Sequence, residues 1–413
     1  MSTGKRIVFF DFLKAICILL VIFCHFPMLP DKSVLGNVFM TISWSSVPCF
    51  MMVSGSIMHQ AQNDFSWKKH LLNQLKIYAV ICIWRVVYLI AFCFGSKSSF
   101  DVNCIIEYIF FFKELDGYKT GVIWYMRVYF MIMCIYPVTY HLFKTYEGKK
   151  ILIYVMVICF IQGIFIPSTQ WFIELIDVKN IVITGLEDAF PFNYEGNSVN
   201  LFFYFLVGAF LYEYKNRILD GKFMNKYLPY VVFSCATLIL LLIKYTSTHS
   251  LLWGGVYLTA GYKRLATVFL SISLYIITLR FSQKHINLTS FLANQVGKYT
   301  LGVFYVHYIM LAGLHEFVYP YLETYYSFGM NCLKTFVALI ICLVITRIGR
   351  KIPVASLLFR WMCIINGIYY LLVFLGAEVN CIGFVVFLNV ITYLQSFIST
   401  DAWNGGTNGW AIS

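Results

Sequence analysis

Apolar runs long enough to cross a lipid bilayer recur along almost the whole chain, and they restrict the fold more than any other feature. Crossing ~30 Å of hydrocarbon takes ~17–25 helical residues, and a backbone in lipid has to satisfy its own hydrogen bonds. Of the 413 residues, 60% are hydrophobic and 12% are charged, whereas soluble domains carry about 25% charged residues. The sequence therefore predicts an all-α, polytopic transmembrane helical bundle.

The predicted bundle has about 10 core spans and one or two extra apolar segments near the C-terminal end. The core spans are predicted at 7–29, 37–58, 77–95, 121–143, 151–167, 199–213, 227–245, 264–281, 299–318 and 331–348. The extra segments are 361–377 and 381–398, so the predicted membrane domain is 1–360 and the role of 361–413 is not predicted. The longest polar connection, 168–198, has enough aromatic residues to fold over the bundle as a lid.

Basic residues are distributed unevenly between the two sides of the predicted bundle. Nineteen of the 31 lysines and arginines fall on the side of the N-terminus, and nine fall on the opposite side. The positive-inside rule then predicts a multi-pass protein of the cell (inner, cytoplasmic) membrane with a cytoplasmic N-terminus. The net charge of +12 thus mainly reflects the topology of the protein, and attraction to anionic lipid or phosphate is a secondary effect. It does not indicate nucleic acid.

The 13 cysteines contain no CxxC pair and no histidine spacing suited to zinc. Most of them stand in apolar runs, where a thiol behaves as a small packing residue. We therefore predict no metal site, no structural disulfide and no permanently bound cofactor.

The first predicted span contains three ionisable residues, within DFLKAICILLVIFCHF at 11–26. A charged side chain at mid-bilayer costs about 2.5–3.5 kcal/mol on insertion scales, so such residues usually face the protein interior. Lys14 and His25 are about three turns apart, with ~16 Å of axial rise, and Asp11 lies beside Lys14 on the same face. We predict an inward-facing stripe in which Asp11 neutralises Lys14. The alternative is that Asp11 and Lys14 reach the headgroups while His25 lies at the opposite interface.

This first span and five later motifs resemble acyltransferase family 3, whose members are integral membrane enzymes. Its first helix has a basic residue, ten intervening residues and a histidine, as Lys14 and His25 have. The later motifs are SVPCFMMVSGSIM (46–58), VIWYMRVYFMIMCIYPV (122–138), FFYFLVGAFLYEY (202–214), VGKYTLGVFYVHYIML (296–311) and RIGRKIPV (347–354). One departure is the Arg-x-x-Arg pair of the third span, where this chain has Asn73 and Lys76, with Lys69 as a substitute charge.

The resemblance implies transfer of an acyl group, usually acetyl, from a cytoplasmic acyl-CoA to a hydroxyl of a surface or lipid-linked glycan. His25 is the predicted base, because histidine titrates near neutral pH; a covalent acyl-histidine intermediate is the alternative. Lys14 is predicted to order the pantetheine arm or to stabilise charge at the thioester carbonyl. The expected partners are acyl-CoA (acetyl-CoA as co-substrate), the glycan acceptor and the bilayer.

Further basic and aromatic residues are assigned to the two substrates. Lys68, Lys69 and Lys76 are expected to bind the phosphates of acyl-CoA, or else to be an ordinary positive-inside loop. Arg85 is grouped with them and needs a partner, for which Glu107 and Asp11 are the candidates.

The predicted acceptor site contains Arg127, Trp124, Tyr305 and His307. Arginine beside aromatic rings suits sugar binding by hydrogen bonding and stacking. For His307 two interpretations stay open, namely a second histidine of the catalytic site and a core residue bonded to a backbone carbonyl.

Two other functions compete with the enzyme. The charged stripe would also suit a transporter or flippase of a lipid-linked sugar or polysaccharide, and a non-catalytic membrane scaffold is the third possibility. Acceptor labelling from radiolabelled acetyl-CoA, and its loss on replacement of His25, separates them.

Overall fold

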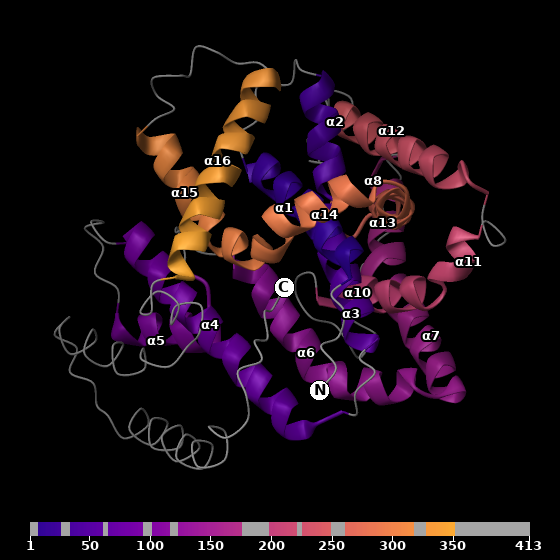
Figure 1. Ribbon diagram of the computed structural model, residues 1–413, viewed down its shortest axis with the longest axis horizontal. Helices are drawn as coiled ribbons and strands as arrows, with labels where there is room; N and C mark the ends of the chain where they lie inside the picture. The colour runs from indigo at the N-terminus through magenta and orange to yellow at the C-terminus, as the bar shows by residue number, and fades with distance from the viewer. Residues whose placement is uncertain are drawn as a thin grey trace. The chain divides into compact units, whose positions relative to one another are not determined.

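The described chain is entirely helical in the computed structural model, as the apolar runs predict (Figure 1). The structure describes residues 7–25, 34–60, 65–93, 101–115, 123–175, 198–220, 225–248, 261–317 and 328–351. No strand occurs among these residues. The predicted C-terminal apolar segments lie outside the described residues, as does 176–197, the larger part of the predicted lid.

Six helices of the described chain are long and apolar enough to cross a membrane, and this confirms the prediction of a multi-pass membrane protein. They are Val8–His25, Val34–His59, Trp67–Ala91, Tyr146–Gln170, Leu265–Lys284 and Phe328–Gly349. The predicted count of about ten is not confirmed. Ser198–Glu213, for example, coincides with a predicted span but is a shorter apolar helix.

The chain forms two compact units, of which the larger consists of Met1–Gln74 and Trp124–Thr346. Its elements are α1 (Val8–His25), α2 (Val34–Ser43), α3 (Ser46–His59), the first turns of α4 (Trp67–Cys93), α6 (Trp124–Phe143), α7 (Tyr146–Phe160), η2 (Ile161–Phe165), α8 (Ile166–Leu175), α10 (Ser198–Glu213), α11 (Lys215–Leu219), α12 (Leu228–Thr248), α13 (Leu265–Lys284), α14 (Ile286–Gln295), η3 (Gly297–Tyr299), α15 (Thr300–Phe317) and α16 (Phe328–Gly349). The smaller unit, Leu75–Ile123 and Arg347–Ser413, contains the rest of α4 and α5 (Val102–Phe111).

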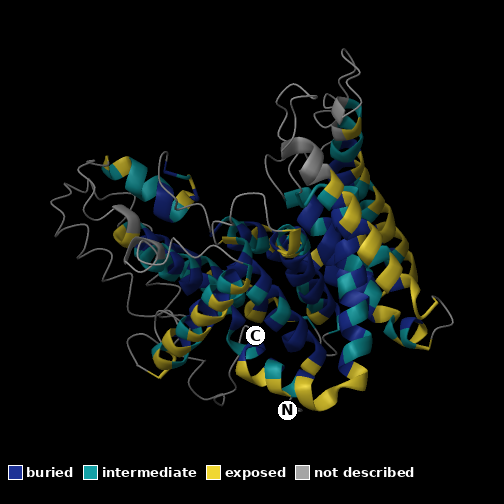
Figure 2. Cartoon of the chain, turned by 90° about the horizontal axis from the view of Figure 1, so that it is seen from above, coloured by how far each residue is buried: buried dark blue, intermediate teal, exposed yellow. Residues whose placement is uncertain are grey.

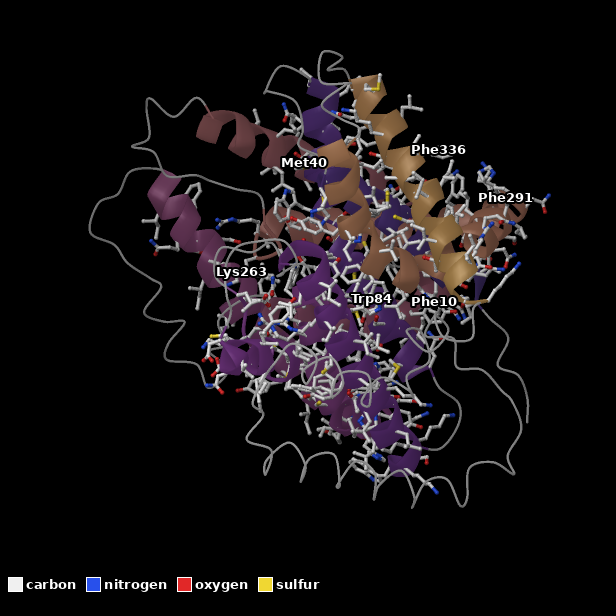
Figure 3. The ribbon with its side chains drawn as sticks, turned by 90° about the vertical axis from the view of Figure 1, so that its left-hand side faces the viewer. Phe10, Met40, Trp84, Lys263, Phe291 and Phe336 are labelled. Carbon is white, nitrogen blue, oxygen red and sulfur yellow. The ribbon has the colours of Figure 1, made fainter. Side chains whose placement is uncertain are left out.

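Helix α1 is the centre of the larger unit. It contacts α2, α3, α13, α14, α15 and η3, and most of its side chains are buried, Phe10 among them (Figure 3). Peripheral helices instead expose apolar side chains along one face, as α16 does with Phe336, which is 56% exposed. Figure 2 shows the same contrast, with buried residues where helices meet and exposed residues on outward faces. Exposed apolar faces are expected where a helix borders lipid.

Helices α3 and α10 cross with their backbones in direct contact. A Cβ atom at Gly55 would overlap the carbonyl oxygen of Phe205, and one at Gly208 would overlap that of Met52. Ser56 Oγ lies 2.8 Å from the Gly208 carbonyl oxygen and 2.8 Å from the hydroxyl of Tyr275 on α13. Small residues and hydroxyl hydrogen bonds are the usual means of holding helices together in lipid. The crossing joins α3, α10 and α13 into the frame that supports α1.

We predict that Gly208→Ala destabilises the protein, because the added methyl group meets backbone that cannot rotate away. Overpacking of this kind costs at least about 1–3 kcal/mol. Thermal unfolding of the purified protein in detergent measures the loss. Gly313→Ala in α15 is the matched control, since a Cβ there meets no atom within 4 Å. Equal melting temperatures for the two variants would contradict the prediction.

Candidate active site

A buried ion pair occupies the first half of α1. The Nζ atom of Lys14 lies 3.1 Å from Oδ1 of Asp11, one turn earlier, and the two residues are 7% and 3% exposed. Asp11 also lies in the first turn of the helix, where a negative charge interacts favourably with the helix dipole. The prediction that Asp11 neutralises Lys14 inside the protein is confirmed. The alternative placed Asp11 and Lys14 at the headgroups and His25 at the opposite interface. Its first part does not hold, because neighbouring helices enclose Asp11 and Lys14, whereas His25 is exposed.

The element that covers this ion pair is η3, the short 3₁₀ turn that leads into α15. A Cβ atom at Gly297 would overlap the carbonyl oxygen of Asp11. Only glycine therefore lets η3 come this close to α1. Gly297, which belongs to the 296–311 motif, thus allows the start of α15 to pack against the turn of α1 that carries Asp11 and Lys14.

The other end of α1 brings two histidines together. His25 is the last residue of α1, and its ring centroid lies 5.3 Å from that of His307 on α15, with a 39° angle between the ring planes. The ring of Tyr308 stands edge-on to His25 at 5.5 Å. His25 is exposed, whereas His307 is fully buried. One partner of the pair is thus accessible and the other is held in place by packing.

The hydrogen bonds of His307 define which of its nitrogens carries the proton. Its Nδ1 atom is bonded to the backbone carbonyl oxygen of Phe304, and a carbonyl oxygen can only accept. Nδ1–H is therefore the donor, and the neutral ring keeps its lone pair on Nε2. Nε2 is buried and has no hydrogen-bond partner among the residues that the structure describes. The bond to a backbone carbonyl, one of the two interpretations of His307, is present, and a catalytic role for His307 stays a prediction.

Aromatic side chains connect the histidine pair with the predicted acceptor residues. The ring of Phe304 lies 5.6 Å from that of His307 and 5.5 Å from that of Tyr125 on α6, and Tyr125 stands edge-on to Trp124 at 6.3 Å. Tyr305 is buried beside Phe304, with 5.7 Å between the rings. Phe304 and Tyr308 were not singled out from the sequence. Their spacing of one helical turn or less from His307 is the only local signal they carry.

The remaining predicted residues lie on α4 and α6. Lys68 and Lys69 are exposed in the first turn of α4, Lys76 is half-buried farther along that helix, and Arg127 is half-buried on α6. These placements leave their assignments to acyl-CoA and acceptor as predictions.

Arg85 has a structural role within the smaller unit. Its Nη2 donates to the carbonyl oxygen of Lys113 at 2.6 Å, its Nε donates to the carbonyl oxygen of Tyr108, and its guanidinium lies 4.0 Å from the Tyr108 ring centroid. Its acidic partner is Glu114, at 3.4 Å. The prediction of Glu107 or Asp11 is therefore wrong. Glu107 pairs with Lys113, and Asp11 pairs with Lys14.

A multi-pass helical bundle in which α1 carries a buried lysine–aspartate pair and ends at a histidine beside a second histidine of α15 has the acid–base groups of a membrane-embedded transferase. The family model described as an acyltransferase domain matches residues 7–347. The chain belongs to this family, acyltransferase family 3, and is a membrane acyltransferase. No curated protein and no solved structure matches it.

We predict that Asp11→Asn lowers the free energy of unfolding by about 3–5 kcal/mol, since it removes the carboxylate that neutralises a buried ammonium group. The double variant Asp11→Leu/Lys14→Met removes both charges and is expected to recover most of the loss. Thermal unfolding of the single and double variants in detergent measures both effects. A single variant as stable as the double variant would show that the pair does not support the fold.

Proposed function

We propose that this protein is an O-acetyltransferase of the cell membrane, with a cytoplasmic N-terminus. It moves an acetyl group from cytoplasmic acetyl-CoA to a hydroxyl of a surface or lipid-linked polysaccharide. The observation that carries the proposal is the arrangement of α1, with the buried Lys14–Asp11 pair toward one end and His25 against His307 at the other. This arrangement provides a donor end and an acceptor end on one helix, within a chain of the acyltransferase family.

In the proposed reaction the acceptor hydroxyl attacks the thioester carbonyl while His25 takes the hydroxyl proton. The new C–O bond forms, the C–S bond breaks, and the proton passes to the departing thiolate to give CoA–SH and the ester. General base catalysis of this kind contributes about 10²–10⁴-fold. His25 suits the role because it is the accessible member of the histidine pair.

His307 acts on His25 in this proposal as a positioning residue. Its buried Nε2 lone pair accepts a hydrogen bond from one ring nitrogen of His25, so that the other nitrogen of His25 faces the acceptor as a base. The bond from His307 Nδ1 to the Phe304 carbonyl supports this assignment, because it holds the ring in the required tautomer.

The proposed binding site for acetyl-CoA, the acyl donor, consists of basic residues. The lysines at the start of α4, Lys68, Lys69 and the neighbouring Lys76, are proposed to bind the phosphates of acetyl-CoA. Lys14 is proposed to order the pantetheine arm of acetyl-CoA as it reaches toward His25, and its partner Asp11 to offset the free-energy cost of burying the ammonium group. Arg127, Trp124 and Tyr305 are proposed to bind the acceptor.

The decisive experiment uses purified protein in liposomes with radiolabelled acetyl-CoA. The acceptor is surface polysaccharide from the source cells, freed of its O-acyl esters by mild alkali. We predict that His25→Ala lowers transfer by about 10²–10⁴-fold without unfolding the protein, because the side chain is exposed. His285→Ala is the control, since His285 is an exposed histidine at the end of α13. Transport of unmodified polysaccharide without labelling would instead establish a transporter.

We predict that His307→Phe lowers kcat by about 10²-fold and leaves the KM for acetyl-CoA unchanged, because the ring is kept in place but the acceptor nitrogen is lost. His307→Gln retains an acceptor atom near the Nε2 position and is expected to recover part of the rate. Steady-state kinetics in the same liposomes separate the two parameters. Equal rates for both variants would assign His307 to packing alone.

A further inference from the structure

We propose that Trp44, Trp124 and Tyr262 form a binding subsite for a pyranose ring of the acceptor. The inference rests on the proposed function and deepens it, because it names the part of the acceptor that the enzyme binds. Trp44 and Tyr262 both lie outside the motifs that resemble the acyltransferase family. We call the three residues the aromatic corner.

The aromatic corner assembles from three segments that are far apart in the sequence. Trp44 lies in the turn between α2 and α3, Tyr262 in the turn before α13, and Trp124 at the first residue of α6. The ring of Tyr262 lies 5.2 Å from that of Trp44 and 5.6 Å from that of Trp124. All three residues are half-buried. They therefore combine fixed positions with accessible ring surface.

Hydrogen bonds fix the turn that carries Tyr262 (Lys263 of this turn is labelled in Figure 3). The hydroxyl of Tyr204 donates to the Tyr262 carbonyl oxygen at 3.1 Å. Ser168 Oγ donates to the Lys263 carbonyl oxygen at 3.1 Å and accepts from the backbone N–H of Leu265 at 2.9 Å, which caps α13. The turn thus holds the Tyr262 ring in place before any ligand arrives, which lowers the entropy cost of binding.

Two independent sets of contacts connect the aromatic corner with the histidine pair. On one side, the helix that ends at His25 packs against α2. The ring of Phe23 lies 5.7 Å from that of Phe39 on α2, and Trp44 directly follows α2.

On the other side, Trp124 contacts Tyr125, Tyr125 contacts Phe304, and Phe304 contacts His307. The corner is therefore connected with the histidine pair through intervening side chains, and an acceptor chain held at the corner extends from there toward His25.

The chemistry of the corner matches a sugar. A pyranose has a face of C–H groups, which packs against aromatic rings, and an edge of hydroxyl groups, which bonds to the indole N–H and the phenol O–H. Aromatic residues that serve the core alone are fully enclosed in this protein, as Tyr204 and Tyr275 are at 0% exposed. Trp44 is also not a lipid-facing residue, because it packs against the buried cluster of Ala236, Leu240 and Leu270.

The test measures steady-state kinetics in liposomes with saturating acetyl-CoA and varied de-O-acylated polysaccharide. We expect Trp44→Leu and Tyr262→Leu each to raise the KM for polysaccharide by about three- to tenfold, as the loss of one aromatic contact predicts. The KM for acetyl-CoA and the slow release of CoA without acceptor are expected to stay unchanged. Trp44→Phe and Tyr262→Phe keep a ring but lose the N–H or O–H donor, so each is expected to raise this KM less than the leucine variant of the same residue. Phe336→Ala on α16 is the control for loss of an exposed aromatic side chain.

A second measurement uses the wild-type protein and so does not depend on the folding of variants. Polysaccharide is expected to protect Trp44 and Trp124 from oxidation by N-bromosuccinimide, read by mass spectrometry, and to leave the oxidation of Trp67 unchanged. An active enzyme whose leucine variants keep the wild-type KM, or whose Trp44 and Trp124 gain no protection, would overturn the subsite and leave the proposed function intact. Absence of transfer by the wild type and by Phe336→Ala would overturn the proposed function itself.

Discussion

The ion pair between Lys14 and Asp11 is the interaction on which the rest of the structure depends. An unpaired charge is too costly inside a bilayer, so α1 has to keep both residues enclosed by other helices. Other helices of the larger unit therefore pack around α1, and the 3₁₀ turn at Gly297 fits directly against the backbone of Asp11. The same enclosure determines where α15 begins. It is therefore α1 that connects the stability of the bundle with the position of its reactive groups.

Because η3 sets the start of α15 against Asp11, it also determines how far along α1 each residue of α15 lies. His307 is placed in this way at the ring of His25. The two histidines then differ in environment, since one is exposed and the other is fully buried with its proton held on Nδ1. A fixed, buried nitrogen next to an accessible one suits the general base role proposed for His25. Packing at one end of the helix thus supports the chemistry proposed at the other.

The two histidines, the aromatic residues that adjoin them and the tight α3–α10 crossing show a common principle. Where reactive side chains have to stay within a fraction of an ångström of their working positions, the supporting structure is dense. Glycines at the crossing bring backbones into contact, and hydrogen bonds from the hydroxyl groups of Tyr204 and Ser168 to the backbone fix the turn before α13. Within the smaller unit, Arg85 fixes the end of α5 and the segment that follows it by donating hydrogen bonds to two backbone carbonyl oxygens. Its contacts are those of a structural arginine.

The sequence by itself determined the helical fold class, the multi-pass character and the ion pair of α1, because these follow from apolar run length and from the one-turn spacing of Asp11 and Lys14. It also selected His25 and His307, although it left the contact between them unknown. Only the tertiary structure decided that contact, the Glu114 partner of Arg85 and the meeting of Trp44 with Tyr262. The residues of such pairs lie on separate segments of the chain. The hydropathy of a segment indicates that it is buried, but it does not specify which other helix packs against it.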